Sequence, residues 1–139
     1  MKKQKIGYTT GVFDLFHIGH LNIIEKAKEN CDILIVGVTT DEEVKRVKNK
    51  TPIIPFEERI RIVDALKYVD KAVPENDTNK LNAWEDLQFD VIFKGTDWKG
   101  TEKWNNYEKE FSKKNVEVMY FPYTDGTSST HLRDVLSRI

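Results

Sequence analysis

The chain has 139 residues, of which 32% are charged, and its formal net charge is −1 at pH 7. This length suits one hydrophobic core, so we expect residues 1–139 to form a single domain. The near-zero net charge gives no global field that favours nucleic acid or an anionic membrane, and the apolar runs are too short to span a bilayer, so neither is an expected partner. The single cysteine, Cys31, excludes an internal disulfide and fits the reducing cytoplasm, where we expect the protein to reside.

Strand and helix patterns alternate along the chain. The residues predict strands over 6–10, 32–38, 71–73, 89–93 and 116–121. They predict helices over about 21–31, 41–47, 55–66, 79–87, 104–114 and 129–137. This order predicts an α/β protein with a Rossmann-like, doubly wound parallel sheet in a single three-layer domain. The GxGxxG dinucleotide motif is missing from the sequence, which disfavours a hydride-transfer enzyme.

Local signals sharpen several of these boundaries. The apolar run 32–38 is typical of a parallel strand that is covered on both faces. Thr40 and Glu43 match a capping box at the start of the helix over 41–47. Pro55 fits the first turn of the next helix, and Pro74 is expected to end the third strand.

The stretch between the first strand and the first helix carries the strongest chemical signal. His17 and His20 flank Gly19 at the mouth of that helix. Imidazole N–H groups can donate to phosphate oxygens, and a helix N-terminus adds unpaired backbone N–H groups and a positive dipole end. Glycine removes the side chain that would hold a phosphate away. In doubly wound sheets, ligands bind at such strand-to-helix junctions. The motif therefore predicts a phosphate-handling site.

Residues 11–20, which read GVFDLFHIGH, resemble the signature of the HxGH nucleotidylyltransferase superfamily. Within it, the chain is most similar to the small cytidylyltransferases, above all those of the glycerol-3-phosphate type, and the likeness runs from about Ile6 to Leu136. The resemblance implies transfer of CMP from CTP to a small phosphomonoester, most simply glycerol phosphate, which gives CDP-glycerol and pyrophosphate by direct in-line attack. It further implies Mg²⁺ carried with the nucleotide, a homodimer, and a role in teichoic-acid or capsule-like polymer synthesis.

A second phosphate-binding segment is expected near the C-terminus. Hydroxyl groups and a glycine precede the last helix, where side chains and backbone N–H groups can converge on an anion. An ordinary turn with a helix cap is the alternative explanation. The segment resembles the RTxGIS motif of the cytidylyltransferases, with Tyr123 at the arginine position and Thr127 at the isoleucine position. It also resembles the ISSTxxR signature of adenylyltransferases, with Arg133 as the arginine.

The resemblance implies a set of site residues. His17, His20, Lys48 and Arg133 are the expected catalytic residues, which stabilise charge on the phosphates. No protein ligand set for a metal is expected. Asp14, Lys67 and Tyr123 are expected on the side of the acceptor. The nucleotide is expected to contact Thr10, Gly11, Val12, Phe13, Gly19, Lys50, Gly95, Thr96, Asp97, Thr127, Ser128, Ser129 and Thr130.

Asp14 and several residues outside this set have possible structural roles. Asp14 could instead hold Mg²⁺, orient a histidine, or cap its own turn. Arg59 suits a structural ion pair more than a ligand contact. Trp98 either packs over the nucleobase or belongs to the core, while Trp104 and Tyr107 are expected in the core.

Other functions remain open from the sequence. An adenylyltransferase of the heptose-phosphate type fits Thr127 to Arg133 and the Lys94-Gly95 segment. A phosphocholine or phosphoethanolamine cytidylyltransferase would keep the nucleotide and change the acceptor. A non-catalytic nucleotide-binding module is the alternative from a different class, although both histidines are present.

Overall fold

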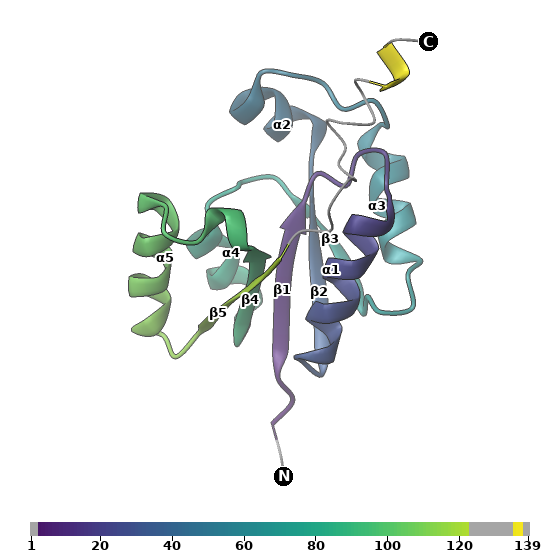
Figure 1. Cartoon of the computed structure of the whole chain (residues 1–139). Coiled ribbons are helices and arrows are strands. Elements are labelled where there is room, and N and C mark those ends of the chain that lie inside the picture. The colour runs from purple at the N-terminus through teal and green to yellow at the C-terminus, as the bar shows by residue number, and fades with distance from the viewer. Residues whose placement is uncertain (1–2, 123–134, 138–139) are drawn as a thin grey trace.

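One five-stranded parallel sheet organises the protein (Figure 1). The computed structural model describes residues 3–122 and 135–137. The first strand lies at the centre of the sheet. The second and third strands follow on one side and the fourth and fifth on the other, so that the strand order is β3-β2-β1-β4-β5. This order confirms the doubly wound prediction. The strands are β1 (Ile6–Gly11), β2 (Ile33–Thr39), β3 (Lys71–Glu75), β4 (Val91–Gly95) and β5 (Glu117–Phe121).

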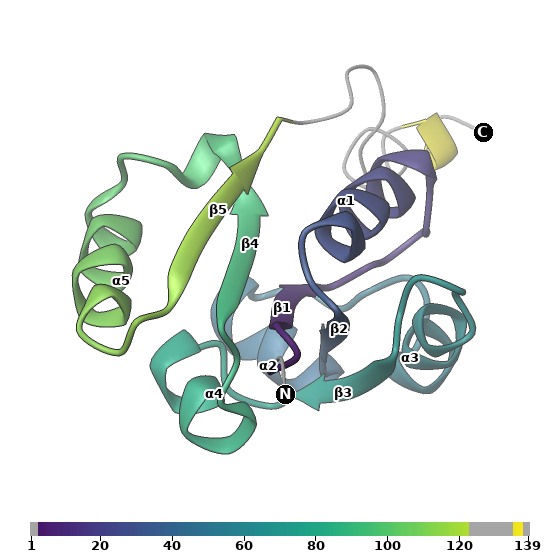
Figure 2. The same ribbon diagram turned by 90° about the horizontal axis from the view of Figure 1, so that it is seen from below.

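Helices cover both faces of the sheet and complete the three layers (Figure 2). On one face lie α1 (Ile18–Glu29) and α3 (Phe56–Asp64), and on the other lie α4 (Lys80–Leu87) and α5 (Glu102–Ser112). The short helix α2 (Asp41–Lys48) follows the carboxyl end of β2, and the 3₁₀ turn η1 (Thr96–Trp98) follows β4. The predicted three-layer α/β architecture is confirmed.

Each face of the sheet has its own apolar core. Leu34, Val36 and Val38 of β2 are fully buried in the cluster that includes α1 and α3. Tyr8 of β1 belongs to the cluster on the other face, together with Trp104 and Tyr107 of α5 and neighbouring aromatic residues. Trp104 and Tyr107 are therefore core residues, as predicted. Burial on both faces explains why β2 reads as one continuous apolar run.

The starts of three helices differ in detail from the sequence prediction. The Thr40 hydroxyl accepts the Glu43 N–H at 3.2 Å, but the Glu43 carboxylate binds Arg46 and Thr78 and leaves the expected capping box incomplete. Pro55 is the N-cap of α3 and lies just before its first turn. Helix α5 starts two residues earlier than predicted, because the Thr101 hydroxyl accepts the Trp104 N–H and caps it.

Pro74 does not end β3, which continues to Glu75. Because β3 is an edge strand that pairs with β2 alone, a proline fits within it. The extra residue places Glu75 at the carboxyl end of the strand, where it is buried.

The C-terminal helix predicted over 129–137 is described in part. Residues 135–137 are helical, and residues 123–134 lie outside the described part of the chain. Among the helices of the described residues, none has the length and apolar character that a membrane span needs.

Candidate nucleotide site

A crevice of about 320 Å³ opens at the carboxyl ends of β1 and β4. It lies at the switch point of the sheet: β2 and β3 lie on one side of β1, and β4 and β5 lie on the other side. Its volume is at the lower end of the 300–1,000 Å³ that is usual for small-molecule sites. Many predicted residues line it, namely Thr10, Gly11, Val12, Phe13, Asp14, His20, Lys48, Lys50, Gly95 and Asp97.

The two histidines form a stacked pair at the start of α1. Their ring centroids are 3.9 Å apart, and His20 lines the crevice. His17 Nδ1 accepts the Gly19 N–H at 3.1 Å, and His20 Nδ1 accepts the His17 N–H at 3.2 Å. In a neutral imidazole, one nitrogen accepts while the other carries the proton. Both histidines are therefore fixed as tautomers whose Nε2 is a donor.

The surroundings disfavour the protonated form of both imidazoles. Burial lowers the pKa of His20 to about 4, with a further contribution from His17, while Asp14 opposes the shift. Burial also lowers the pKa of His17. His17 Nε2 is inaccessible to water and finds no hydrogen-bond partner among the described residues. A buried donor without a partner is unusual, and His17 contacts His20 next to the crevice without lining it.

The pKa of His20 gives a testable pH dependence of stability. The unfolded chain takes up this proton near pH 6.5 and the folded chain near pH 4, so the unfolded state binds more protons between these values. Stability therefore falls as the pH drops through this window, and we expect a loss of about 2 kcal/mol between pH 6.5 and 4.5. Urea unfolding at several pH values measures it.

The control for this prediction is His20→Gln. Glutamine at the third helical position can still accept the backbone N–H of residue 17, as in a capping box. The variant should lose most of the dependence on pH between 6.5 and 4.5, and an unchanged dependence would assign it to other groups. The lowered pKa of Glu43, about 2, places its own titration below this window.

Asp14 ties the crevice to a distant loop. Its buried carboxylate accepts the Ile53 N–H and the Ile54 N–H, each at 2.8 Å. These bonds hold the loop between α2 and α3 against the turn that precedes His17. Phe13 and Leu15 on either side of Asp14 have positive φ values of 54° and 51°, which are uncommon for residues other than glycine. Asp14 lines the crevice, and these two bonds anchor backbone about 40 residues away in the sequence.

Arg59 is a structural residue, as the sequence analysis favoured. Its guanidinium is buried and donates to the carbonyl oxygens of Val12, Thr39 and Ile54 at 2.7–2.8 Å. It also forms an ion pair with Asp41 at 2.6 Å. These contacts join the ends of β1 and β2 to the loop before α3.

Two lysines lie at the end of α2. The helix extends through Lys48, and Asn49 then adopts the left-handed conformation with φ 52°. Lys48 and Lys50 flank this residue and both line the crevice. Lysine ammonium groups at this position can neutralise charge on a triphosphate.

The end of β4 forms the opposite wall. Gly95, Asp97 and Trp98 line the crevice, and Lys94 Nζ lies 4.9 Å from the centroid of the Trp98 ring. Trp98 is 39% exposed, so the alternative that places it in the core is wrong. An exposed indole beside a glycine backbone provides a surface for a flat base. Burial lowers the pKa of Lys94 to about 8.

Some predicted residues do not reach the crevice. Lys67 lies in the connection from α3 to the amino end of β3, at the opposite edge of the sheet, with Nζ 5.2 Å from the centroid of the Tyr68 ring. Gly19 is buried in the first turn of α1, and Thr96 opens η1 without lining the cavity. A further group lies outside the described residues, namely Tyr123, Thr127, Ser128, Ser129, Thr130 and Arg133.

A buried charged pair that the sequence did not predict lies beside the crevice. Glu75 at the end of β3 and Lys80 at the start of α4 form an ion pair, and both are almost fully buried. Their positions carried a signal, because strand carboxyl ends in such sheets face the ligand. The expected end of β3 at Pro74 concealed it.

The described residues offer few protein ligands for Mg²⁺. Among residues 3–122 and 135–137, no three His, Cys, Asp or Glu side chains form a potential metal cluster. Both carboxylate oxygens of Asp14 accept backbone N–H groups. Mg²⁺ often keeps several waters and binds through substrate phosphates and one or two carboxylates. Asp97, which lines the crevice, would be the neighbouring carboxylate for Mg²⁺ that arrives with a nucleotide.

Comparisons with known proteins show the family of this chain. The cytidylyltransferase-like family model matches residues 8–135. Glycerol-3-phosphate cytidylyltransferase of Bacillus subtilis is 35% identical over 130 residues, which are 93% of this chain and 95% of that protein. The Bacillus spizizenii protein of the same name is 37% identical over 90% of this chain and 92% of its own length.

A solved structure shares the fold. The lipopolysaccharide core biosynthesis protein of Thermoplasma volcanium superposes with a TM-score of 0.77 at 26% identity, over 88% of this chain and all of that one. The family match spans most of the sequence, including His17 and His20. The chain belongs to the cytidylyltransferase-like family and is a cytidylyltransferase.

Proposed function

We propose that this enzyme transfers CMP from CTP to the phosphate of glycerol phosphate and releases pyrophosphate. The observation that carries the proposal is the stacked pair of neutral histidines, whose Nδ1 atoms are occupied by backbone N–H groups and whose Nε2 atoms are donors. The relatives named glycerol-3-phosphate cytidylyltransferase support this choice of acceptor. The adjacent lysines supply the positive charge that a triphosphate needs.

The reaction requires no covalent enzyme intermediate. An oxygen of the acceptor phosphate attacks the α-phosphorus of CTP in line, the bond from that phosphorus to the α–β bridging oxygen breaks, and pyrophosphate leaves with the electron pair. His17 and His20 donate hydrogen bonds as charge builds on the phosphate oxygens. Lys48 and Lys50 neutralise the departing pyrophosphate. The protein thus contributes positioning and electrostatic stabilisation.

Further parts of the proposal rest on the family likeness. Asp97 would be the nearby carboxylate for Mg²⁺ carried with the nucleotide, and the ion would neutralise charge on the phosphates. The active form is a homodimer in the cytoplasm. The product supplies activated glycerol phosphate to the synthesis of teichoic-acid or capsule-like polymers.

The test is pyrophosphate release with Mg²⁺, in which CTP and ATP are each combined with four acceptors. These are glycerol 3-phosphate, glycerol 2-phosphate, phosphocholine and heptose 1-phosphate. We expect turnover with CTP and one glycerol phosphate, and background rates with ATP. Turnover only with ATP would replace the nucleotide in the proposal, and preferred turnover with phosphocholine would replace the acceptor.

A further inference from the structure

A second, smaller cavity of about 130 Å³ adjoins the nucleotide crevice. It shares Thr10, Lys48, Lys94 and Trp98 with the crevice, so the two spaces have common walls. Its volume is well below the 300–1,000 Å³ that is usual for drug-sized ligands. The cavity therefore suits a small group beside the nucleotide and is too small for a second nucleoside.

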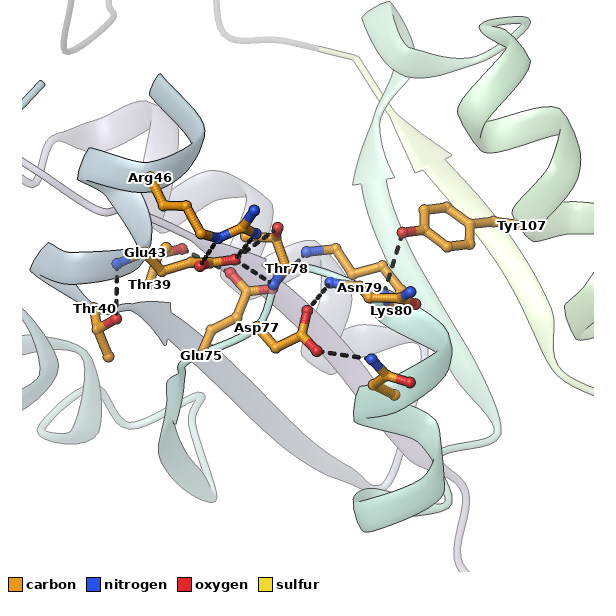
Figure 3. Close-up of polar contacts among 11 residues, drawn as sticks. Thr39, Thr40, Glu43, Arg46, Glu75, Asp77, Thr78, Asn79, Lys80 and Tyr107 are labelled. Atoms are coloured by element: carbon orange, nitrogen blue, oxygen red, sulfur yellow. Dashed lines mark hydrogen bonds and ion pairs between the residues drawn. The ribbon is translucent and has the colours of Figure 1, made fainter. Parts of the chain in front are cut away.

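A buried ion pair forms one wall of this cavity (Figure 3). Glu75 is 4% exposed and Lys80 is 6% exposed. Glu75 Oε2 accepts from Lys80 Nζ, and Glu75 Oε1 accepts from the Thr39 hydroxyl at 2.7 Å. The two side chains come from different elements, β3 and α4, and meet at the carboxyl edge of the sheet.

The Lys80 ammonium has donors to spare. It carries three N–H groups, and within the described part of the chain Glu75 Oε2 is the one acceptor within hydrogen-bond distance. Unmatched donors on a buried charge are costly unless a ligand or water completes them. The carboxylate of Glu75 also retains lone pairs, since each oxygen can accept twice. Together the pair offers both donors and acceptors to a bound molecule.

The helix does not need this pair for its own capping. Asn79 caps α4 through its side-chain oxygen, which accepts the Leu81 N–H at 2.9 Å. A buried ion pair is often no more stabilising than an apolar pair of similar volume, because both charges lose their hydration. Stability alone is therefore a weak reason to place Glu75 and Lys80 beside a cavity.

The remaining walls disfavour a cationic ligand. Lys48, Lys94 and Lys103 line the cavity in addition to Lys80. Its two carboxylates, Glu43 and Glu75, are already paired with Arg46 and Lys80. The excess positive charge repels a quaternary or primary ammonium group and tolerates a neutral or anionic one.

We propose that this cavity holds the alcohol part of the acceptor, and that Glu75 and Lys80 determine specificity by binding its hydroxyl groups. A hydroxyl both donates and accepts, so it can donate to the carboxylate and accept from the ammonium at once. The acceptor class is then a phosphorylated polyol, and amino-alcohol phosphates are excluded. The inference rests on the proposed function, in which a phosphomonoester attacks CTP.

The experiment measures the KM of each substrate for Lys80→Met and Glu75→Gln in the full-length protein. We expect the KM for glycerol phosphate to rise roughly 10- to 100-fold, the range for the loss of hydrogen bonds to a charged group. The KM for CTP should change less than about two-fold. Equal rises in both constants, or no rise for the acceptor, would overturn the inference.

The control is Lys28→Met, which removes a more exposed lysine–carboxylate ion pair elsewhere. Lys28 Nζ binds Asp70 at 2.6 Å near the amino end of β2, away from the cavity. This variant should leave both KM values unchanged. If Lys80→Met does not fold, the double variant Glu75→Gln/Lys80→Met removes both charges together and should show the same loss of acceptor affinity.

A calorimetric titration separates failure of this inference from failure of the proposed function. If no nucleotide supports turnover, glycerol 3-phosphate is titrated into wild-type protein and into the double variant. Binding by the wild type that the variant loses supports the cavity as a polyol-phosphate site while the proposed reaction fails. No binding by the wild type, or equal binding by both proteins, overturns the inference.

Discussion

His17→Asn should lower kcat by about 100- to 1,000-fold, the effect of removing one donor to a charged transition state. Asparagine is a good N-cap, so its side chain can still accept the Gly19 N–H that His17 Nδ1 accepts at 3.1 Å. The variant therefore separates the structural role of Nδ1 from the chemical role of Nε2. Since the lost bond strengthens in the transition state, kcat and kcat/KM should fall together.

Thr101→Asn provides the matched control for this prediction. Thr101 caps α5 with the same kind of bond, because its hydroxyl accepts the Trp104 N–H at 3.3 Å, and it lines neither cavity. We expect unchanged kcat and a similar melting temperature. His17→Ala should also lose activity, with an additional loss of about 1 kcal/mol of stability from the missing cap. A folded His17→Asn enzyme with near-wild-type kcat would refute the assigned role.

The elements that the sequence predicts well are those with a local cause. The run 32–38 reads as a buried parallel strand because helices cover both faces of β2. The pair His17 and His20 lies at the mouth of α1 because a strand, a short turn and a helix follow one another directly. Periodicity and capping residues are sufficient for such features.

The features that escaped prediction depend on contacts between distant segments. Asp14 binds backbone N–H groups at Ile53 and Ile54, about 40 residues away in the sequence, so its turn alone could not reveal the anchor. Glu43 fits a capping box by spacing, but Thr78 and Arg46 compete for its carboxylate. The burial of Glu75 likewise depends on a distant segment, because it lies in β3, which pairs with β2.

The residues predicted for the crevice divide in the same way, into those placed by local sequence signals and those that are not. Lys48, Lys50 and Gly95 lie next to elements whose ends the sequence marks, and all three line the site. Lys67 was assigned by likeness in sequence alone, and the single chain places it at the other edge of the sheet. A motif can identify a family, but the position of a side chain such as Lys67 depends on which helix, strand or loop contains it.

Arg59→Met should destabilise the protein by about 3–5 kcal/mol, because three carbonyl oxygens lose a buried donor at about 1–3 kcal/mol each. The guanidinium is 1% exposed and satisfies the carbonyl oxygens of Val12, Thr39 and Ile54. Methionine fills similar space without a donor, so these three acceptors lose their partner while Asp41 loses its ion pair. The midpoint of urea unfolding measures the loss.

Two further variants show whether the geometry or the charge of Arg59 matters. Arg59→Lys keeps the positive charge but cannot reproduce a planar fork that reaches four acceptors, so it should recover only part of the lost stability. Arg61→Met, on the exposed side of the same helix, should change stability by less than about 0.5 kcal/mol. Because the fork joins the ends of β1 and β2, a folded Arg59→Lys protein should also bind CTP more weakly. If Arg59→Met and Arg61→Met unfold at the same urea concentration, the guanidinium does not support the crevice, and the alignment of its walls must come from the sheet itself.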